Sequence, residues 1–189
     1  MSLQKLYKYY FISSSRTIDE IKLSHSNQSY YEPLIASYLT THTTRVLIAN
    51  ADMNRIDKTK YIYDIKYVQE RLYVCAADIY NDKQNKTYSK DGYPNCSECD
   101  KCTRTMFALE LLGKLDFYSN QFNIHKYKYK KRELYDEMLR RKHSESQYRD
   151  LFLLMQENNY TMPISIKGKV YLSLMLRKIF RQLTRLIPK

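Results

Sequence analysis

The chain is short of the residues that sharp turns and phosphate-binding loops need. It holds 3 glycines, 4 prolines and no tryptophan among 189 residues. The glycines, Gly92, Gly113 and Gly168, are isolated from one another. A phosphate cradle needs consecutive backbone amides that approach the anion closely. The sequence therefore excludes a glycine-rich phosphate loop.

Long apolar runs are also missing. No stretch approaches the about 20 apolar residues that a membrane-spanning helix needs. The first charges are not followed by the apolar segment of a secretion signal. Since domains usually hold roughly 100–200 residues, we expect a soluble, cytoplasmic protein of one domain with appendages.

Acidic residues are the minority among the charges. The chain has 20 Asp and Glu against 32 Lys and Arg, a net charge of +12. Such a surplus favours an anionic partner, which would be nucleic acid, a phosphate compound or an acidic membrane. Lys, Asn, Ile and Tyr are all abundant, however, as in proteins of AT-rich genomes, so codon usage is an equal explanation.

The pattern of apolar residues predicts two short strands followed by helices. Residues 9–12 and 45–49 are rich in the aromatic and β-branched residues that strands prefer. Helical spacing starts at Thr17–Ile21, continues over Asp57–Glu70 and Thr103–Leu115, where Gly113 is typical of a helix end, and returns from Glu133 with a break at Met162–Pro163. We expect an α/β remnant that is mainly helical, with a basic amphipathic helix at its C-terminus.

All four cysteines fit one metal site. Cys96, Cys99 and Cys102 repeat a CxxC spacing, and Cys75 lies about twenty residues upstream. Zinc accepts four thiolates in a tetrahedron, which is a common structural arrangement. Four protein ligands leave no position for a reactive water. We therefore expect a structural zinc knuckle with four cysteine ligands, in which Lys101 and Arg104 offset part of the thiolate charge.

Three other uses of these cysteines remain open. Disulfides are disfavoured, because the expected compartment keeps thiols reduced. A redox CxxC pair would leave two of the four thiols unexplained. An iron–sulfur cluster needs a similar set of four thiolates and is the nearest alternative to zinc.

The cysteine segment resembles a known family. Residues 94–105, followed by Ala108-Leu109-Glu110 and Gly113, resemble the NCxxCxKCxRTxxALExxG segment of a bacterial group related to 7-cyano-7-deazaguanine synthase. That group belongs to the PP-loop (N-type) ATP pyrophosphatase superfamily and includes members linked to surface glycans. Upstream matches occur in the same order at Ser13–Ser15, Ser24-His25, Pro33-Leu34, residues 55–62 and Leu72–Cys75, so the resemblance covers about residues 10–125.

The resemblance implies an adenylating protein that lacks its ATP-binding half. Complete members carry an SGGxDS phosphate loop in an N-terminal Rossmann-like half, and this chain has none. It would then be the C-terminal portion of a longer or split protein, or a descendant that has lost the ATPase chemistry.

The same resemblance suggests residues for a nucleotide pocket. By resemblance, Arg55 and Lys58 lie on a helix after a strand and face that pocket. Ordinary exposed charges at a helix start explain them equally well. His25 could face the same pocket, but a single histidine in a polar loop is usually solvated. The spacing of residues indicates no catalytic set of Ser, His and Asp and no catalytic carboxylate pair.

Two basic segments offer a different function. Residues 125–132 interleave cations with tyrosines, as proteins that bind single-stranded nucleic acid do, although we favour a solvated linker here. Residues 172–186 place apolar residues on one helical face and Arg177, Arg181 and Arg185 on the other. Such a helix can lie on an anionic membrane. Packing of its apolar face against its own domain is the commoner outcome.

We therefore expect residues 1–125 to form a PP-loop-ATPase-like portion with the knuckle, and residues 126–189 to form a basic helical tail. The favoured function is a zinc-stabilised module of a bacterial adenylating protein, inactive alone and completed by a separate ATPase half that brings ATP, or by self-association. The alternative is a non-enzymatic zinc module that binds nucleic acid or an anionic membrane surface.

Overall fold

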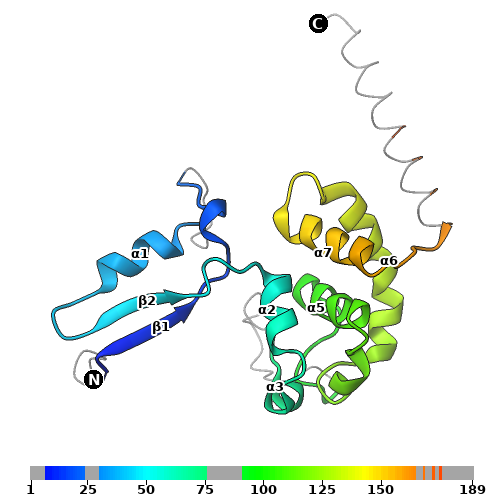
Figure 1. Ribbon diagram of the computed structural model, residues 1–189. Coiled ribbons are helices and arrows are strands. Elements are labelled where there is room, and N and C mark those ends of the chain that lie inside the picture. The colour runs from blue at the N-terminus through cyan, green and yellow to red at the C-terminus, as the bar shows by residue number, and fades with distance from the viewer. Residues whose placement is uncertain are drawn as a thin grey trace, which may run out of the picture. The chain divides into compact units, whose positions relative to one another are not determined.

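The computed structural model describes residues 7–23, 30–75 and 91–164, together with residues 168, 172 and 175. In these ranges six α-helices accompany two short strands (Figure 1). The elements, in chain order, are β1 (Tyr9–Ser13), the 3-10 turn η2 (Ile18–Glu20), α1 (Glu32–Leu39), β2 (Arg45–Ala49), α2 (Arg55–Ile62), α3 (Lys66–Arg71), α5 (Asp100–Leu111), the 3-10 turn η4 (Leu115–Tyr118), α6 (Ile124–Arg141) and α7 (Ser146–Glu157). The expected mainly helical fold with two strands is confirmed.

The chain divides into two compact units. Unit 1 is Met1–Lys58 and unit 2 is Thr59–Lys189. The division falls at residue 58 and not at the expected residue 125. The segment from residue 126 to the end of α7 belongs to unit 2, because α6 and α7 pack against each other and against α5. None of the described helices is both long and apolar enough to cross a membrane.

Unit 1 is a small piece of α/β structure. β1 and β2 pair in parallel, with Tyr9 opposite Arg45 and Phe11 opposite Leu47. The chain crosses between the two strands through α1, which contacts β2 (Figure 1). Turn η2 begins as the sequence predicts, because the amide of Thr17 donates to the Glu20 carboxylate in a capping box. Among the described residues, the buried apolar side chains of this unit are Ala36 of α1 and Ile56 of α2.

Unit 2 is built around α5, which is buried along most of its length. Met106 and Phe107 have no exposed surface, and Met138 of α6 and Leu151 of α7 are buried equally completely. The helix ends where the sequence predicts. Gly113 has φ +68°, and the amide of Lys114 reaches back to the Leu109 carbonyl at 2.8 Å. This is the pattern of a glycine-terminated helix.

The predicted helix over Asp57–Glu70 is wrong in one respect, because two helices share the segment. Ile65 is extended at the start of α3. The carbonyl of Tyr63 accepts hydrogen bonds from the Tyr118 hydroxyl at 2.9 Å and the Gln69 amide at 3.0 Å. These partners replace the helical bond that the break removes, so η4 and α3 fix its position.

Candidate metal centre

The four cysteine thiols converge on one point in unit 2. All four Sγ atoms lie within 4.8 Å of one another. The Sγ atoms of Cys75 and Cys99 are 4.0 Å apart, and those of Cys96 and Cys102 are 3.8 Å apart. A tetrahedral zinc ion with bonds of about 2.3 Å separates its sulfur ligands by about 3.8 Å. The spacing therefore fits one ion, and every cysteine is a free thiol.

Two segments far apart in sequence supply the ligands. Cys75 ends an extended segment after α3, whereas Cys96 and Cys99 lie in the turn that leads into α5. Cys102 lies in the first turn of α5 and has no exposed surface. The backbone amide of Cys99 donates to the Cys96 sulfur at 3.3 Å. Such an amide stabilises negative charge on a thiolate.

Ser97 closes this turn. It is the second residue of the first CxxC and adopts a φ of +63°, which non-glycine residues rarely take. Its side chain is fully buried. The hydroxyl donates to the Asn95 carbonyl at 3.3 Å and accepts the Asn123 amide at 2.8 Å, just before α6. These bonds hold a strained residue in place and anchor the turn to the start of α6.

Asn95 joins the two ligand segments, a role that the sequence did not suggest. Its side chain is fully buried. The amide oxygen accepts the backbone N–H groups of Val74 at 2.8 Å and Cys75 at 3.1 Å. The amide nitrogen donates to the carbonyls of Leu72 at 2.8 Å and Gln121 at 3.1 Å. This one side chain therefore fixes the segment that carries Cys75 beside the segment that carries the other three ligands.

The pKa values of two of the thiols are raised in the absence of a metal ion. Hydrogen bonding to Cys96 and Cys99, together with burial, raises the pKa of the Cys102 thiol far above its usual range. The bond to Cys102 lowers the pKa of Cys96, but the bond to Cys99 and burial outweigh it and raise that pKa to about 11. Crowded thiols resist deprotonation until a positive charge is placed between them. A dication bound between the four sulfur atoms would supply that charge.

Arg104, which we expect to offset thiolate charge, forms its ion pair with an aspartate of the same helix. Its guanidinium, which is 7% exposed, pairs with the Asp100 carboxylate at 2.7 Å. The same group donates to Gln147 of α7 and lies 5.4 Å from the centre of the Tyr148 ring. Its charge is therefore balanced by Asp100, and Arg104 fastens the start of α5 to α7. Lys101 is half-buried on the same helix.

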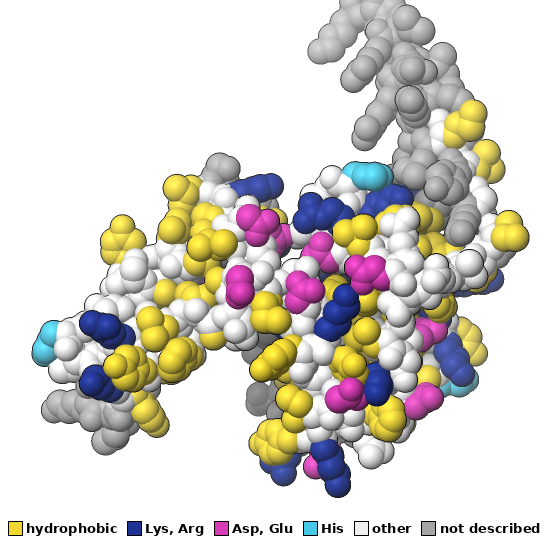
Figure 2. Space-filling model, viewed as in Figure 1, with side chains coloured by type: hydrophobic (Ala, Val, Ile, Leu, Met, Phe, Trp, Pro, Cys, Tyr) yellow, Lys and Arg dark blue, Asp and Glu magenta, His cyan; other side chains and the backbone are white. Residues whose placement is uncertain are grey.

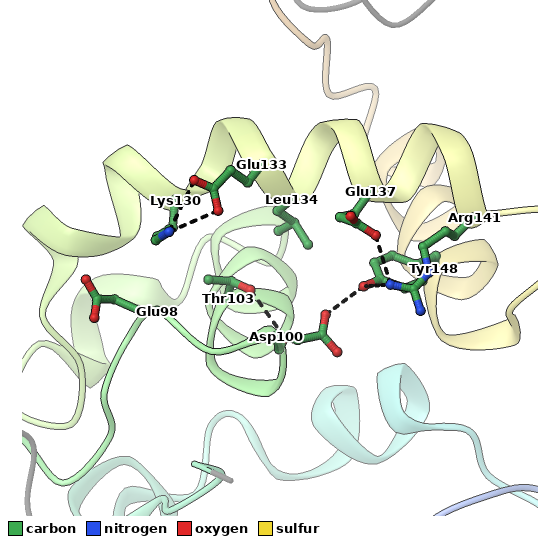
Figure 3. A pocket seen from close by; sticks show the side chains of 9 residues that line it. All are labelled: Glu98, Asp100, Thr103, Lys130, Glu133, Leu134, Glu137, Arg141 and Tyr148. Atoms are coloured by element: carbon green, nitrogen blue, oxygen red, sulfur yellow. Dashed lines mark hydrogen bonds and ion pairs between the residues drawn. The ribbon is translucent and has the colours of Figure 1, made fainter. Parts of the chain in front are cut away.

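A hollow of about 330 Å³ lies next to the turn that carries the cysteines. Figure 3 labels the nine side chains that line it, which come from α5, α6, α7 and the turn before α5. Most of the charged side chains in the hollow form ion pairs or hydrogen bonds with one another. Lys130 binds Glu133 at 3.0 Å, Arg141 binds Glu137 at 2.8 Å, and Tyr148 donates to Asp100 at 2.7 Å. Because its charges are paired, the hollow does not indicate a particular ligand.

Arg55 and Lys58 lie in unit 1, on the helix α2 that follows β2 as the resemblance implies. The Lys58 ammonium donates to the Ser14 carbonyl, just beyond β1, at 2.5 Å. Burial lowers the pKa of Lys58, and the nearby Arg55 charge lowers it further. Lys58 thus points to the carboxyl end of the parallel strand pair. His25 lies outside the described residues.

The basic run at residues 125–132 is a packed helix, so the expected solvated linker is wrong. Tyr127 is 1% exposed and donates to the Glu110 carboxylate at 2.5 Å. Lys126 pairs with Asp91 at 2.5 Å, and Lys131 pairs with Glu110. Lys126, Tyr127 and Lys131 are therefore engaged in the fold, whereas Tyr129 of the same run is 71% exposed. The pattern of apolar residues could not predict this packing, because the acidic partners Glu110 and Asp91 are distant in sequence.

The predicted C-terminal basic helix lies mostly outside the described residues, and its three arginines at positions 177, 181 and 185 are among those outside. Most of the polar insertion that starts at residue 78 is outside them as well. Leu172 and Met175 belong to the apolar face of the helix and are described. They are helical and 60% and 64% exposed.

Comparison with known proteins identifies neither a family nor a function. No protein-family model, curated protein or solved structure matches the chain.

Proposed function

We propose that this chain is a zinc-stabilised module of a PP-loop-like adenylating protein, related to 7-cyano-7-deazaguanine synthase and acting in bacterial biosynthesis, with surface polysaccharide as the product that the resemblance suggests. The convergence of four thiols within 4.8 Å supports the metal part of the proposal. Zinc is favoured over other divalent ions because four sulfur ligands at tetrahedral spacing suit it. The ion would join the segment after α3 to the start of α5.

The adenylating part is supported by the carboxyl ends of β1 and β2. Ligands of parallel α/β sheets bind at that end of the strands. Here the Lys58 ammonium bonds the Ser14 carbonyl, and its pKa responds to Arg55 and also to Asp52 and Glu32. Two cations on α2 therefore lie close to where a nucleotide phosphate would sit. The chain has no phosphate loop, so a separate polypeptide would bring one together with ATP.

The test is release of pyrophosphate from ATP. We expect none from the chain alone, and release when it is combined with a partner polypeptide that carries an SGGxDS loop and copurifies with it from its native cells. Lys58→Ala should lower the rate at least about tenfold, which corresponds to one lost charged contact of roughly 1.4 kcal/mol.

Lys60→Ala is the matched control, because Lys60 is on the same helix but pairs with Glu157 at 2.9 Å and is 39% exposed. It should leave the rate unchanged. A combined preparation without ATP turnover would refute the adenylating function while leaving the zinc site intact. Equal rates for the Lys58 and Lys60 variants would refute the role of Lys58.

A further inference from the structure

The outer edge of β1 is open. In a parallel pair, alternate residues of each strand direct both backbone groups to the neighbour. The amide of Arg45 donates to the Lys8 carbonyl at 2.8 Å, and that of Ser14 donates to the Ala49 carbonyl at 3.2 Å. Even-numbered residues of β1 therefore bond β2. The backbone groups of Tyr9, Phe11 and Ser13 point away from it, and no hydrogen bond from the described residues covers them.

β1 also lacks the features that normally protect an edge strand. Tyr9–Ser13 contains no charge, proline, glycine or bulge. The outer edge of β2 is different. There the Thr40 hydroxyl accepts the Val46 amide at 3.0 Å and donates to the Val46 carbonyl at 3.4 Å. A side chain thus blocks the outer edge of β2, whereas no described residue bonds to the outer edge of β1.

Apolar side chains are exposed around this free edge. Tyr9 and Phe11 are 48% and 64% exposed, and Leu47, opposite Phe11, is 40% exposed. On α1, exposed apolar residues occur at Leu34, Ile35, Tyr38 and Leu39. In Figure 2 hydrophobic side chains cover much of the surface of unit 1. Parallel sheets are normally buried on both faces, and an isolated two-stranded sheet is marginal in water.

We infer that β1 pairs with β1 of a second copy of this chain, antiparallel about a two-fold axis at Phe11. Tyr9 of one copy then meets Ser13 of the other, and Tyr10 meets Ile12, so no like charges face each other within the strand. Tyr9, Phe11 and Ser13 exchange backbone hydrogen bonds across the axis. The product is a four-stranded sheet of ordinary size, in the order β2-β1-β1-β2.

A second copy of the chain is favoured as the partner of β1 because opposite charges would meet at both ends of the paired strands. In the same register Lys8 of one copy lies opposite Ser14 of the other. The neighbouring Ser15 binds the Glu32 carboxylate through its amide at 3.2 Å and its hydroxyl at 2.7 Å. Lys8 and Ser14 share one face of the sheet, because side chains alternate along a strand. The half-buried Ile12, Val46 and Ile48 lie on that same face, so we expect α1 to cover it. Each Lys8 therefore comes beside the Glu32 of the other copy.

The test measures mass by light scattering over a range of concentrations. The chain of 22.8 kDa should appear at twice that mass. Phe11→Pro removes an outward amide and leaves every β1–β2 bond in place, so it should give a folded monomer. Ile48→Pro removes an outward amide from the opposite edge and should remain a dimer. Circular dichroism checks that both variants fold.

Exchanging the charges of Lys8 and Glu32 gives a second test, because loss of folding alone would not be reversed by the double variant. Lys8→Glu should raise the dimer dissociation constant about tenfold. The double variant with Lys8→Glu and Glu32→Lys should restore it. A wild-type chain that stays monomeric, or a dimer that Phe11→Pro leaves intact, overturns the inference. Either result would mean that β1 does not pair with a second copy of the chain. The experiment is independent of zinc and of ATP, so its outcome does not bear on the proposed function.

Discussion

Units 1 and 2 differ in how they obtain a core. Unit 2 buries large side chains such as Phe107, Tyr127 and Met138 almost completely and adds four converging thiols. Unit 1 leaves Phe11, Tyr38 and Leu39 more than half exposed, and the apolar side chains that it buries among the described residues are small in number. A two-stranded parallel sheet with one helix cannot cover its own faces. Among the described residues, unit 2 thus has an extensive buried core and unit 1 has a small one.

Charge separates the units as well. Unit 1 has 7 Lys and Arg against 5 Asp and Glu, a surplus of two. Unit 2 has 25 against 15 and thus carries ten of the twelve surplus charges, seven of them after residue 157, where no acidic residue occurs. A nearly neutral, apolar surface suits docking to protein, whereas a concentrated surplus suits an anionic partner. The exposed apolar surface of unit 1 and most of the surplus positive charge therefore lie in different units.

Removing the metal should produce the largest difference between the units. Zinc–thiolate binding contributes on the order of 10 kcal/mol to folding small modules. We expect one zinc per chain by elemental analysis, and loss of most helical dichroism on chelation or in Cys99→Ser. Amide exchange in β1 and β2 should stay unchanged. Added zinc should restore the helices, whereas magnesium, which prefers oxygen ligands, should not.

A metal-free chain with full helicity, or a Cys99→Ser protein as stable as the parent, would show that the thiols serve another purpose. Iron in place of zinc would support the iron–sulfur alternative.

Truncating one phenylalanine in each unit sharpens the comparison. Phe107 is fully buried, with its ring edge-to-face against Tyr135 at 5.4 Å and Tyr160 at 5.6 Å. Phe107→Ala should lower the free energy of unfolding by about 3–5 kcal/mol. Phe11→Ala should change it by less than about 0.5 kcal/mol, as for an exposed site. Urea unfolding at concentrations where the chain is monomeric measures both, and similar losses would contradict the assignment of cores.

Local sequence signals predicted much of this structure. The two strands were visible because aromatic and β-branched residues cluster over five positions, and the end of α5 was visible from Gly113. The thiol cluster followed from the CxxC spacing. Each of these features depends on residues within a few positions of one another, except for Cys75, which was assigned because no other cysteine remained.

Features that depend on distant partners were missed. The break before α3 exists because Tyr118, 55 residues further along the chain, bonds the Tyr63 carbonyl. The basic run in α6 is packed because Glu110 accepts Tyr127 and Lys131 from 17 and 21 residues away. Asn95 bonds residues 20 to 23 positions before it and one residue 26 positions after it. Periodicity reports which face of an element is apolar, but not which polar group will meet it.

Asn95→Ala tests how far unit 2 depends on polar bonds around the thiols rather than on the ion alone. The change removes four hydrogen bonds and leaves the amides of Val74 and Cys75 without their acceptor beside the site. A buried donor without a partner costs about 1–3 kcal/mol, so the zinc-loaded chain should lose about 2–3 kcal/mol, less than in Phe107→Ala. Zinc should also be lost more readily to a competing chelator, because Cys75 is no longer held beside the other ligands.

Asn158→Ala is the matched control for this prediction. Asn158 follows α7, and its side chain donates to the Leu154 carbonyl at 2.8 Å. Since that side chain is exposed, water replaces the bond and the loss should stay within about 0.5 kcal/mol. Urea unfolding and chelator competition compare the two variants. If Asn95→Ala kept its zinc as firmly as Asn158→Ala, the ion alone would hold Cys75 in place, and the buried amide would only fill space between the two segments.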